Sequence, residues 1–391
     1  MKKSIFMLAL ASLAFVGCSK DEITEVNQGD PIRFTANASK ASRADVTTTT
    51  SINIDGSKFH VWAYYGDAEF MDGLATKSGD VWTYQTPKYW PNEGTVDFYA
   101  VHPTSIEELA TVSAASQMVN NFIVKSTVTE QLDFIYAINL DEEKQTSAVP
   151  MNFRHALSQI VFAAKSGANS NLSVTIDGVS VHNIYGQGDY TFPKLGTEVQ
   201  LKPDTNAETE KSDVEGIEDT YGTWVLEGEV TSFVAGITAA TITPGTDEIL
   251  TTESADAVAD DPNTTEDETK AAVTSGALLL LPQGPADDRG ALKAWDPAKE
   301  TVGTTTGTYF KISCKVWDDE SDVYLYGGES KFGNVYIPVA IDWEQGKKYT
   351  YIFTFDDGAG YDENGDEILV PIKFTVTVDE FQSEDDITVD M

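Results

Sequence analysis

Two residues near the N-terminus, Cys18 and Arg43, are of types that could undergo covalent processing. Two lysines precede an apolar run over residues 5–16, and a glycine and Cys18 follow it. This layout is typical of a bacterial secretory signal, and the run is too short to span a bilayer as a permanent helix. Because the end of the run resembles a lipobox, we expect residues 1–17 to be removed and Cys18 to be acylated. The lipid would then anchor the exported chain to a membrane.

Arg43 lies in a stretch of small and polar residues that continues into a valine and four threonines. Such a composition suits an exposed linker that a protease can reach. A cut between Arg43 and Ala44 would separate residues 18–43 from the rest of the chain. The residues alone also allow a second interpretation, in which Arg43 follows an N-terminal edge strand and is never cut.

The segment before Arg43 reads as a β-strand that such a cut would release. Pro31 to Asn37 alternate, with Ile32, Phe34 and Ala36 on one face. Removal of this strand would leave an apolar groove with unpaired backbone donors and acceptors. A strand from another subunit could fill that groove by strand addition.

Elsewhere the chain offers little catalytic chemistry. The four histidines have no partner at a metal-ligand spacing, so we predict no metal and no cofactor. There is also no nucleophile elbow and no phosphate-binding glycine loop, and we expect a chain that is not an enzyme. The histidines are His60, His102, His155 and His182. His155 follows Phe153 and Arg154 at the start of an apolar run, and we expect it to have a structural role.

Two weaker binding interpretations remain open, together with a rival of the enzyme class. The acidic turn at 362–367 could offer oxygen ligands to calcium, although it lacks the EF-hand spacing. A group of aromatic residues close in sequence could stack on sugars, and it comprises Trp62, Tyr64, Trp82, Tyr84, Tyr89 and Trp90. A hydrolase would need two carboxylates paired across a pocket, and the sequence does not give their separation.

The charge of the chain excludes several partners. The formal net charge is −37, which repels nucleic acid and anionic membrane surfaces. Once Cys18 is acylated, Cys314 is the remaining cysteine, so no intramolecular disulfide can form. Cys314 lies in a strand-like run, and we expect it to be a small buried residue rather than a reactive thiol.

Period-two alternation predicts a mainly β protein. The clearest strands cover residues 349–355 and 371–381, which we expect to form a C-terminal hairpin across a turn-rich segment. A second hairpin is predicted at Asp177-Gly178. Helical periodicity is confined to short pieces such as 105–115, and 244–270 reads as a long acidic loop. A charged break at 141–147 suggests a domain boundary.

Several short motifs occur one after another along the chain. They are Lys88-Tyr89-Trp90-Pro91, residues 96–103, residues 133–137, residues 153–160, residues 278–283 and residues 343–351. Their order resembles that of the fimbrillin family, the major and minor pilins of Bacteroidetes. No single motif is decisive, but their order and spacing over residues 31–391 make the resemblance fairly specific.

The resemblance implies an all-β fold of two tandem transthyretin-like antiparallel β-sandwich domains with short helical pieces. The corresponding division is a signal peptide (1–17), a tether and removable strand (18–43), an N-terminal domain (44–147) and a C-terminal domain (148–391). It also implies a lipoprotein at the outer membrane and cell surface, trimming by an arginine-specific protease, and polymerisation by strand exchange with other pilin subunits. Arg43 and Ala44 lie where that cut would fall.

The short alternating tail with Ile387 and Val389 could be the donor strand of such a polymer or simply the last core strand. Adhesion to a host protein or glycan is a further expectation. The alternative is a monomeric surface lipoprotein that binds glycan through the aromatic group described above.

Overall fold

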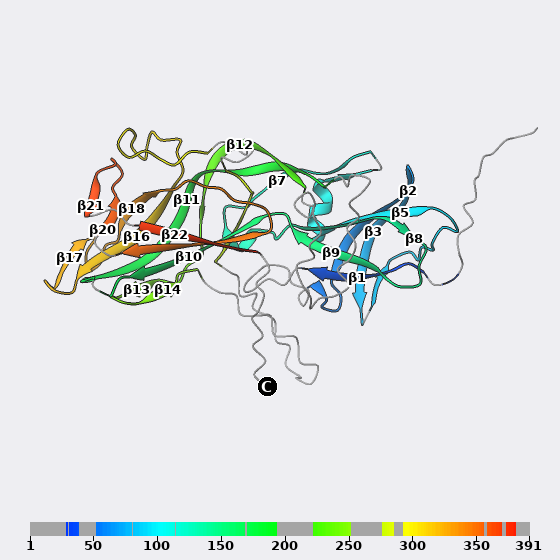
Figure 1. Cartoon of the computed structure of the whole chain (residues 1–391), viewed down its shortest axis with the longest axis horizontal. Coiled ribbons are helices and arrows are strands. Elements are labelled where there is room, and N and C mark those ends of the chain that lie inside the picture. Colours follow the sequence, from blue (N-terminus) through cyan, green and yellow to red (C-terminus); the bar gives the residue numbers. More distant parts are fainter. Residues whose placement is uncertain are drawn as a thin grey trace, which may run out of the picture.

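The chain forms an elongated, mainly β molecule with a barrel at one end and a sandwich at the other (Figure 1). The structure is a computed structural model. It describes residues 29, 31–38, 52–79, 81–113, 115–168, 170–193, 222–251, 276–284, 292–355, 358–369 and 373–380. The prediction of an all-β fold with short helical pieces is confirmed.

The N-terminal barrel is a single sheet closed on itself in the order β1-β4-β3-β2-β5-β8-β9. Its neighbours pair antiparallel except for β1 and β9, which run parallel. The 3₁₀ helix η1 (Thr104–Leu109) begins shortly after β5 ends. The barrel strands are β1 (Arg33–Ala38), β2 (Lys58–Tyr65), β3 (Ala68–Ser78), β4 (Val81–Tyr84), β5 (Thr95–His102), β8 (Ile135–Glu143) and β9 (Val149–His155).

The C-terminal sandwich consists of a 5-stranded and a 10-stranded sheet. The smaller sheet contains β10 (Ser158–Ser166), β14 (Asp247–Ile249), β15 (Leu278–Leu280), β19 (Lys347–Phe355) and β22 (Lys373–Glu380). The larger contains β6 (Ala110–Val112), β7 (Gln117–Ile123), β11 (Leu172–Thr191), β12 (Thr223–Val234), β13 (Ala240–Ile242), β16 (Tyr309–Asp318), β17 (Val323–Tyr326), β18 (Gly333–Pro338), β20 (Gly358–Tyr361) and β21 (Glu367–Leu369). A second 3₁₀ helix, η2, covers Val128–Glu130.

The two sheets of the sandwich face each other through aromatic side chains. Phe310 of β16 lies 5.4 Å from Phe162 of β10 and 5.6 Å from Phe353 of β19, measured between ring centroids. Phe162 and Phe353 themselves stack at 5.9 Å. Alternation explains this core, because every second residue of β19 from Tyr349 onward is buried.

Three barrel strands are apolar on both faces, since each face meets a different core. On β2, Val61 and Ala63 face the barrel interior, whereas Trp62 and Tyr64 belong to the cluster shared with the sandwich. β5 and β8 repeat this division with residues 98–101 and 135–138. The sequence of these strands is therefore nearly continuous in hydrophobic residues, as expected for strands buried on both faces.

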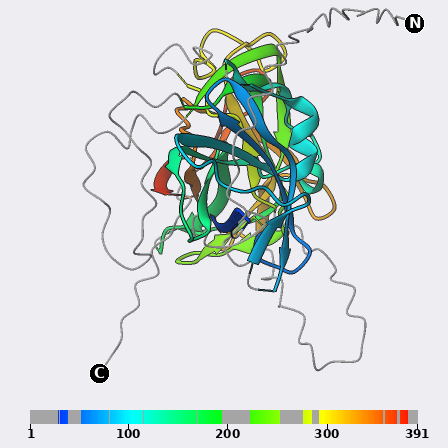
Figure 2. The same cartoon turned by 90° about the vertical axis from the view of Figure 1, so that its right-hand side faces the viewer.

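Aromatic rings join the barrel to the sandwich. Tyr136 of β8 lies 5.2 Å from Tyr190 of β11, and Phe134 lies 6.0 Å from Trp224 of β12. The indole Nε1 of Trp224 donates a hydrogen bond of 2.7 Å to the carbonyl of Ala156, directly after β9. Figure 2 looks from the barrel end, where the blue and cyan barrel strands lie in front of the green sandwich strands.

The C-terminal strands pair as predicted, but their surroundings differ from the prediction. β19 and β22 are antiparallel neighbours, and the segment between them forms the small β20–β21 hairpin in the other sheet. Val376 and Val378 of β22 are 43% and 53% exposed, so the described residues leave uncovered the apolar face expected for this strand. The reason is that β22 is an edge strand and extends along the sheet beyond Phe374, which packs against Phe310.

The hairpin predicted at Asp177-Gly178 is wrong. β11 continues through both residues, and a register shift between Ile176 and Gly178 against β16 marks a β-bulge there. Because β16 pairs with β11 on both sides of the bulge, the strand continues through Asp177-Gly178 instead of turning back. The segment 105–115 likewise contains η1 and β6 rather than one longer helix.

The segments predicted to be an acidic loop and a domain boundary are more structured than the sequence suggested. Within 244–270, β14 pairs with β10, and residues 252–270 lie outside the described residues. Strands on both sides of residue 147 belong to both parts of the molecule. β9, after residue 147, completes the barrel, whereas β6 and β7, before it, belong to the larger sheet of the sandwich. In the described part of the chain, no helix is long and apolar enough to cross a membrane.

Trp224→Ala is expected to lower the free energy of unfolding by about 3–5 kcal/mol, because it leaves a cavity between the barrel and the sandwich. Trp224 is 7% exposed and its neighbour Val225 is 56% exposed. Val225→Ala is therefore the matched control and should change stability by less than about 0.5 kcal/mol. Chemical denaturation measures both. Equal costs for the two variants would contradict this assignment of the interface.

Candidate functional site

The strand predicted to be removable, β1, closes the N-terminal barrel. On one edge it pairs antiparallel with β4, through Arg33↔Thr83 and Phe34↔Trp82. On the other edge it pairs parallel with β9, from Phe34↔Val149 to Ala38↔Phe153. Just before the strand, the amide of Ile32 donates a 2.7 Å hydrogen bond to the carbonyl of Lys88. β1 is therefore held by backbone hydrogen bonds on both sides.

The predicted inward face of β1 lies in the barrel core. Ile32, Phe34 and Ala36 are 3%, 1% and 3% exposed, whereas Thr35 is exposed. The ring of Phe34 lies 5.9 Å from Phe59 and 5.7 Å from Phe98, in edge-to-face geometry that favours aromatic pairs. The alternation identified in the sequence thus corresponds to the packing of this strand.

Asn53 adds a side-chain contact to β1 that the sequence interpretation missed. Its amide Nδ2 donates to the carbonyl of Ala36 at 2.7 Å, and its Oδ1 accepts from the indole Nε1 of Trp82 at 2.9 Å. The preceding residue, Ile52, is 1% exposed and belongs to the barrel core. The apolar isoleucine after the threonine run was the available signal that the chain returns to the barrel there.

The other residues named for processing and exchange lie outside the described residues. They are Cys18, Arg43, Ala44, Ile387 and Val389. Ala38 is the last described residue before Arg43, and Ile52 is the first after it. Both ends of this segment therefore meet the barrel core through buried side chains.

The aromatic group proposed for glycan stacking is mostly core. Trp62, Tyr64, Trp82 and Trp90 are each at most 6% exposed. Tyr84 and Tyr89 are half-buried, and the hydroxyl of Tyr84 donates to the carbonyl of Asp72 at 2.7 Å. Trp82 and Trp90 lie in the barrel core, whereas Trp62 and Tyr64 lie in the core shared with the sandwich, so these rings do not form an exposed sugar platform.

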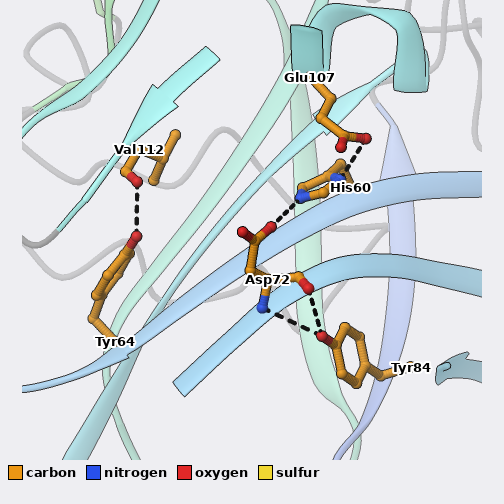
Figure 3. Close-up of polar contacts among 6 residues, drawn as sticks. All are labelled: His60, Tyr64, Asp72, Tyr84, Glu107 and Val112. Carbon is orange, nitrogen blue, oxygen red and sulfur yellow. Dashed lines mark hydrogen bonds and ion pairs between the residues drawn. The ribbon is translucent and has the colours of Figure 1, made fainter. Parts of the chain in front are cut away.

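His60 is the residue whose surroundings most resemble an acid–base site (Figure 3). Its Nε2 lies 2.7 Å from Oδ1 of Asp72, and its Nδ1 lies 2.6 Å from Oε2 of Glu107. The Glu107 contact has the distance of an ion pair but not the angle of a hydrogen bond. The His60 ring also lies 4.1 Å from the Trp62 ring.

This arrangement leaves neither ring nitrogen of His60 open to a substrate. The side chain of His60 is 4% exposed, and the two carboxylates approach it from opposite sides. Asp72 comes from β3 and Glu107 from η1, so the contacts tie both elements to β2. Among the described residues, no group of three or more His, Cys, Asp or Glu side chains could hold a metal ion.

The other histidines also contact the protein itself. His155 Nδ1 lies 2.9 Å from Oδ1 of Asp133, and both side chains are at most 5% exposed. A buried pair of this kind is costly to break, because removal of one partner leaves the other without compensation. His102 Nδ1 lies 2.9 Å from the carbonyl of Lys58, and burial lowers the His102 pKa. Each ring therefore has a structural contact of its own.

Cys314 and the acidic turn at 362–367 match their structural interpretations. Burial raises the pKa of the Cys314 thiol to about 12, which disfavours the reactive thiolate. In the turn, Asp362 Oδ1 accepts hydrogen bonds from the amides of Asn364 and Asp366 at 2.8 and 3.0 Å. The Asp362 carboxylate thus stabilises the tip between β20 and β21.

Comparison with known proteins places the chain in a family. A family model described as fimbrillin-like matches residues 24–380. The chain therefore belongs to the fimbrillin-like family, which confirms the resemblance seen in its motifs. Among the curated proteins no match was found.

The chain is also similar to several solved structures. A proposed cell adhesion protein of Bacteroides uniformis ATCC 8492 is 15% identical, with a TM-score of 0.44 and coverage of 90% of this chain and 99% of that chain. The C-terminally truncated tip fimbrial protein Mfa3 of Porphyromonas gingivalis is 9% identical, with a TM-score of 0.39 and coverage of 89% and 99%. A fimbrilin of Porphyromonas gingivalis W83 is 10% identical, with a TM-score of 0.38 and coverage of 93% and 100%.

Phe34→Ala is expected to destabilise the barrel by about 3–5 kcal/mol, because Phe34 fills the centre of its core. Amide hydrogen exchange should show the loss of protection at β9, residues 149–153, which pair with β1. Thr35→Ala, at the exposed neighbouring position, is the control. Unchanged protection of β9 in Phe34→Ala would show that β1 does not hold the barrel closed.

His182 gives a prediction for the pH dependence of stability. Burial, with a smaller contribution from Lys311, lowers the pKa of His182 from 6.5 to about 4. Between these values the unfolded chain binds a proton that the folded chain does not. The free energy of unfolding should therefore fall by about 2 kcal/mol as the pH falls from about 6.5 to about 4, after allowance for partial exposure.

Denaturation of the wild type and of His182→Gln over this pH range isolates the contribution of His182. The variant should lose this part of the acid sensitivity, because glutamine does not titrate. Ring resonances of His182 that titrate near 6.5 in the folded protein would contradict the prediction.

Proposed function

We propose that the chain is a structural fimbrial subunit that is exported as a lipoprotein through Cys18, cut after Arg43, and polymerised at the cell surface by strand exchange. Membership of the fimbrillin-like family supports a fimbrial subunit that associates with other pilin subunits at the cell surface. The observation that carries the mechanism is the position of β1, the first described strand, between β4 and β9 in the barrel. Its function in this proposal is non-covalent and needs no catalytic group.

Removal of β1 would open the barrel along one defined groove. The groove would be bounded by β4 and β9 and floored by Phe59, Phe98 and Phe153. Backbone groups of residues 149–153 would lose their strand partner. Exposed aromatic rings and unpaired amides are both unfavourable in water, and a strand with alternating apolar residues would relieve both.

A cut after Arg43 changes how β1 is retained rather than its contacts. After the cut, residues 18–43 would be held by the hydrogen bonds and apolar contacts of β1 alone. A donor strand of better fit could then displace them, and we propose the tail with Ile387 and Val389 as that donor. The tail follows β22, which is an edge strand of the smaller sheet.

The monomeric glycan-binding alternative lacks its surface, because the aromatic group on which it depended is largely buried. The enzyme alternative needs two carboxylates paired across a pocket, whereas the two carboxylates nearest His60 contact its buried ring. The fimbrial proposal is therefore the one that the described residues favour.

Treatment of the full precursor with an arginine-specific protease is expected to give a new N-terminus at Ala44, followed by ladders of multimers. Arg43→Lys should abolish both, because such a protease does not cut after lysine. Arg33→Lys is the matched control, since Arg33 lies inside β1 and should be protected there. Edman sequencing and size-exclusion chromatography provide the readout.

Two outcomes would overturn this mechanism. The first is that multimers form unchanged in Arg43→Lys, and the second is an N-terminus at Phe34, which would mean that β1 itself is cut. A synthetic peptide of residues 29–43 adds a further test, because it should compete with the donor strand and slow multimerisation. The same peptide with Phe34→Ala should compete far less, since it lacks the side chain that fills the groove.

A further inference from the structure

The short strand β17 presents an unpaired edge at the end of the molecule opposite the barrel (Figure 1). It pairs with β16 through Val316↔Tyr326, Trp317↔Tyr324 and Asp318↔Val323. Within the described residues, no strand pairs with its other edge. The backbone donors and acceptors of that edge are therefore available to another polypeptide.

Three consecutive apolar residues of β17 are exposed. Val323, Tyr324 and Leu325 are 45%, 40% and 41% exposed. In a half-buried strand one face would be covered, but here both faces of the ribbon reach solvent. The exposed surface thus continues around the free edge instead of occupying one side of a sheet.

Neighbouring side chains hold this surface in place. The ring of Tyr324 lies 4.8 Å from Trp317 in edge-to-face geometry, and Nζ of Lys315 lies 6.0 Å from its centroid. The Lys315 ammonium also lies 4.6 Å from the centroid of Phe332 and donates a 2.7 Å hydrogen bond to the carbonyl of Glu329. A partner would therefore meet a preformed surface, which reduces the entropy lost on binding.

Carboxylates flank the apolar residues in the sequence. The segment 315–331 holds two lysines and five carboxylates, which belong to Asp318, Asp319, Glu320, Asp322 and Glu329. Hydrogen bonds from the Glu320 amide and the Ser321 hydroxyl lower the pKa of Asp318, so this carboxylate stays ionised. These carboxylates favour a basic partner at this edge and disfavour its pairing with the same edge of a second copy, which carries the same carboxylates.

We propose that β17 is a docking edge for an extended, lysine- or arginine-bearing segment of another protein. The segment adds as a strand to the free edge, and its apolar side chains contact Val323, Tyr324 and Leu325. Its cations contact the carboxylates at 318–322, between β16 and β17. This site is independent of strand exchange at β1, because it lies in the sandwich and uses no residue of the barrel.

The test uses the full chain and a fluorescent peptide of alternating lysine and valine, with binding followed by anisotropy at physiological salt. Leu325→Ser should weaken binding by about tenfold, because it removes apolar contact at the centre of the edge. Asp322→Asn should weaken binding about threefold and reduce its salt dependence. Both positions are exposed, so thermal unfolding should stay at the wild-type temperature.

Matched controls separate strand addition from non-specific attraction to an acidic protein. The same peptide with N-methyl groups at alternate residues keeps its charge but cannot pair, and it should not bind measurably. Val234→Ser removes a valine that is 58% exposed on β12, another edge strand, and should leave affinity unchanged. Equal binding of the methylated peptide, or equal affinity of Leu325→Ser and the wild type, would overturn the proposal.

Discussion

The N-terminal barrel closes through one short strand, and this closure is the constraint on which its core depends. β1 is the neighbour of both β4 and β9, so without it the sheet would have two free edges. Its inward residues meet Phe59 and Phe98 at the centre of the barrel. A strand in this position has to be present for the core to stay dry, but the hydrogen-bond pattern does not require that it belong to the same chain.

The closure of the barrel by β1 does not involve the contacts that join the barrel to the sandwich, because these two sets of contacts belong to different hydrophobic clusters. Phe34 and the other inward residues of β1 belong to the barrel cluster, whereas the aromatic rings that join the barrel to the sandwich belong to the other cluster. Strands β2, β5 and β8 separate the two, since alternate residues of each strand face opposite cores. A change at β1 would therefore expose the barrel interior without removing the contacts of Trp224 or Tyr136.

Two buried histidines contact carboxylates from other segments of the chain. His155 with Asp133 lies where β9 ends and β8 begins, and His60 holds β3 and η1 against β2. In both cases the ring contacts a carboxylate that comes from another segment of the fold. Such contacts specify how the segments join.

Several features of this protein follow from the sequence by itself. Alternation identified β1 and β19, because a strand that is buried on one face has to repeat every second residue. It also located β22, although Val376 and Val378 of that strand are exposed. The order of the short motifs identified the family. The inward face of β1 could also be predicted, since Ile32, Phe34 and Ala36 share one parity.

Other features were decided only by the tertiary structure. The Asp177-Gly178 pair became a bulge because β16 pairs with β11 on both sides of it. Val376 and Val378 of the edge strand β22 are exposed, because none of the described elements covers them. The aromatic group of β2 and β4 was buried, Asn53 reached β1, and Asp72 and Glu107 met at His60. Local sequence fixes which residues share a face, but the partner of that face is set by contacts between segments that are distant in the chain.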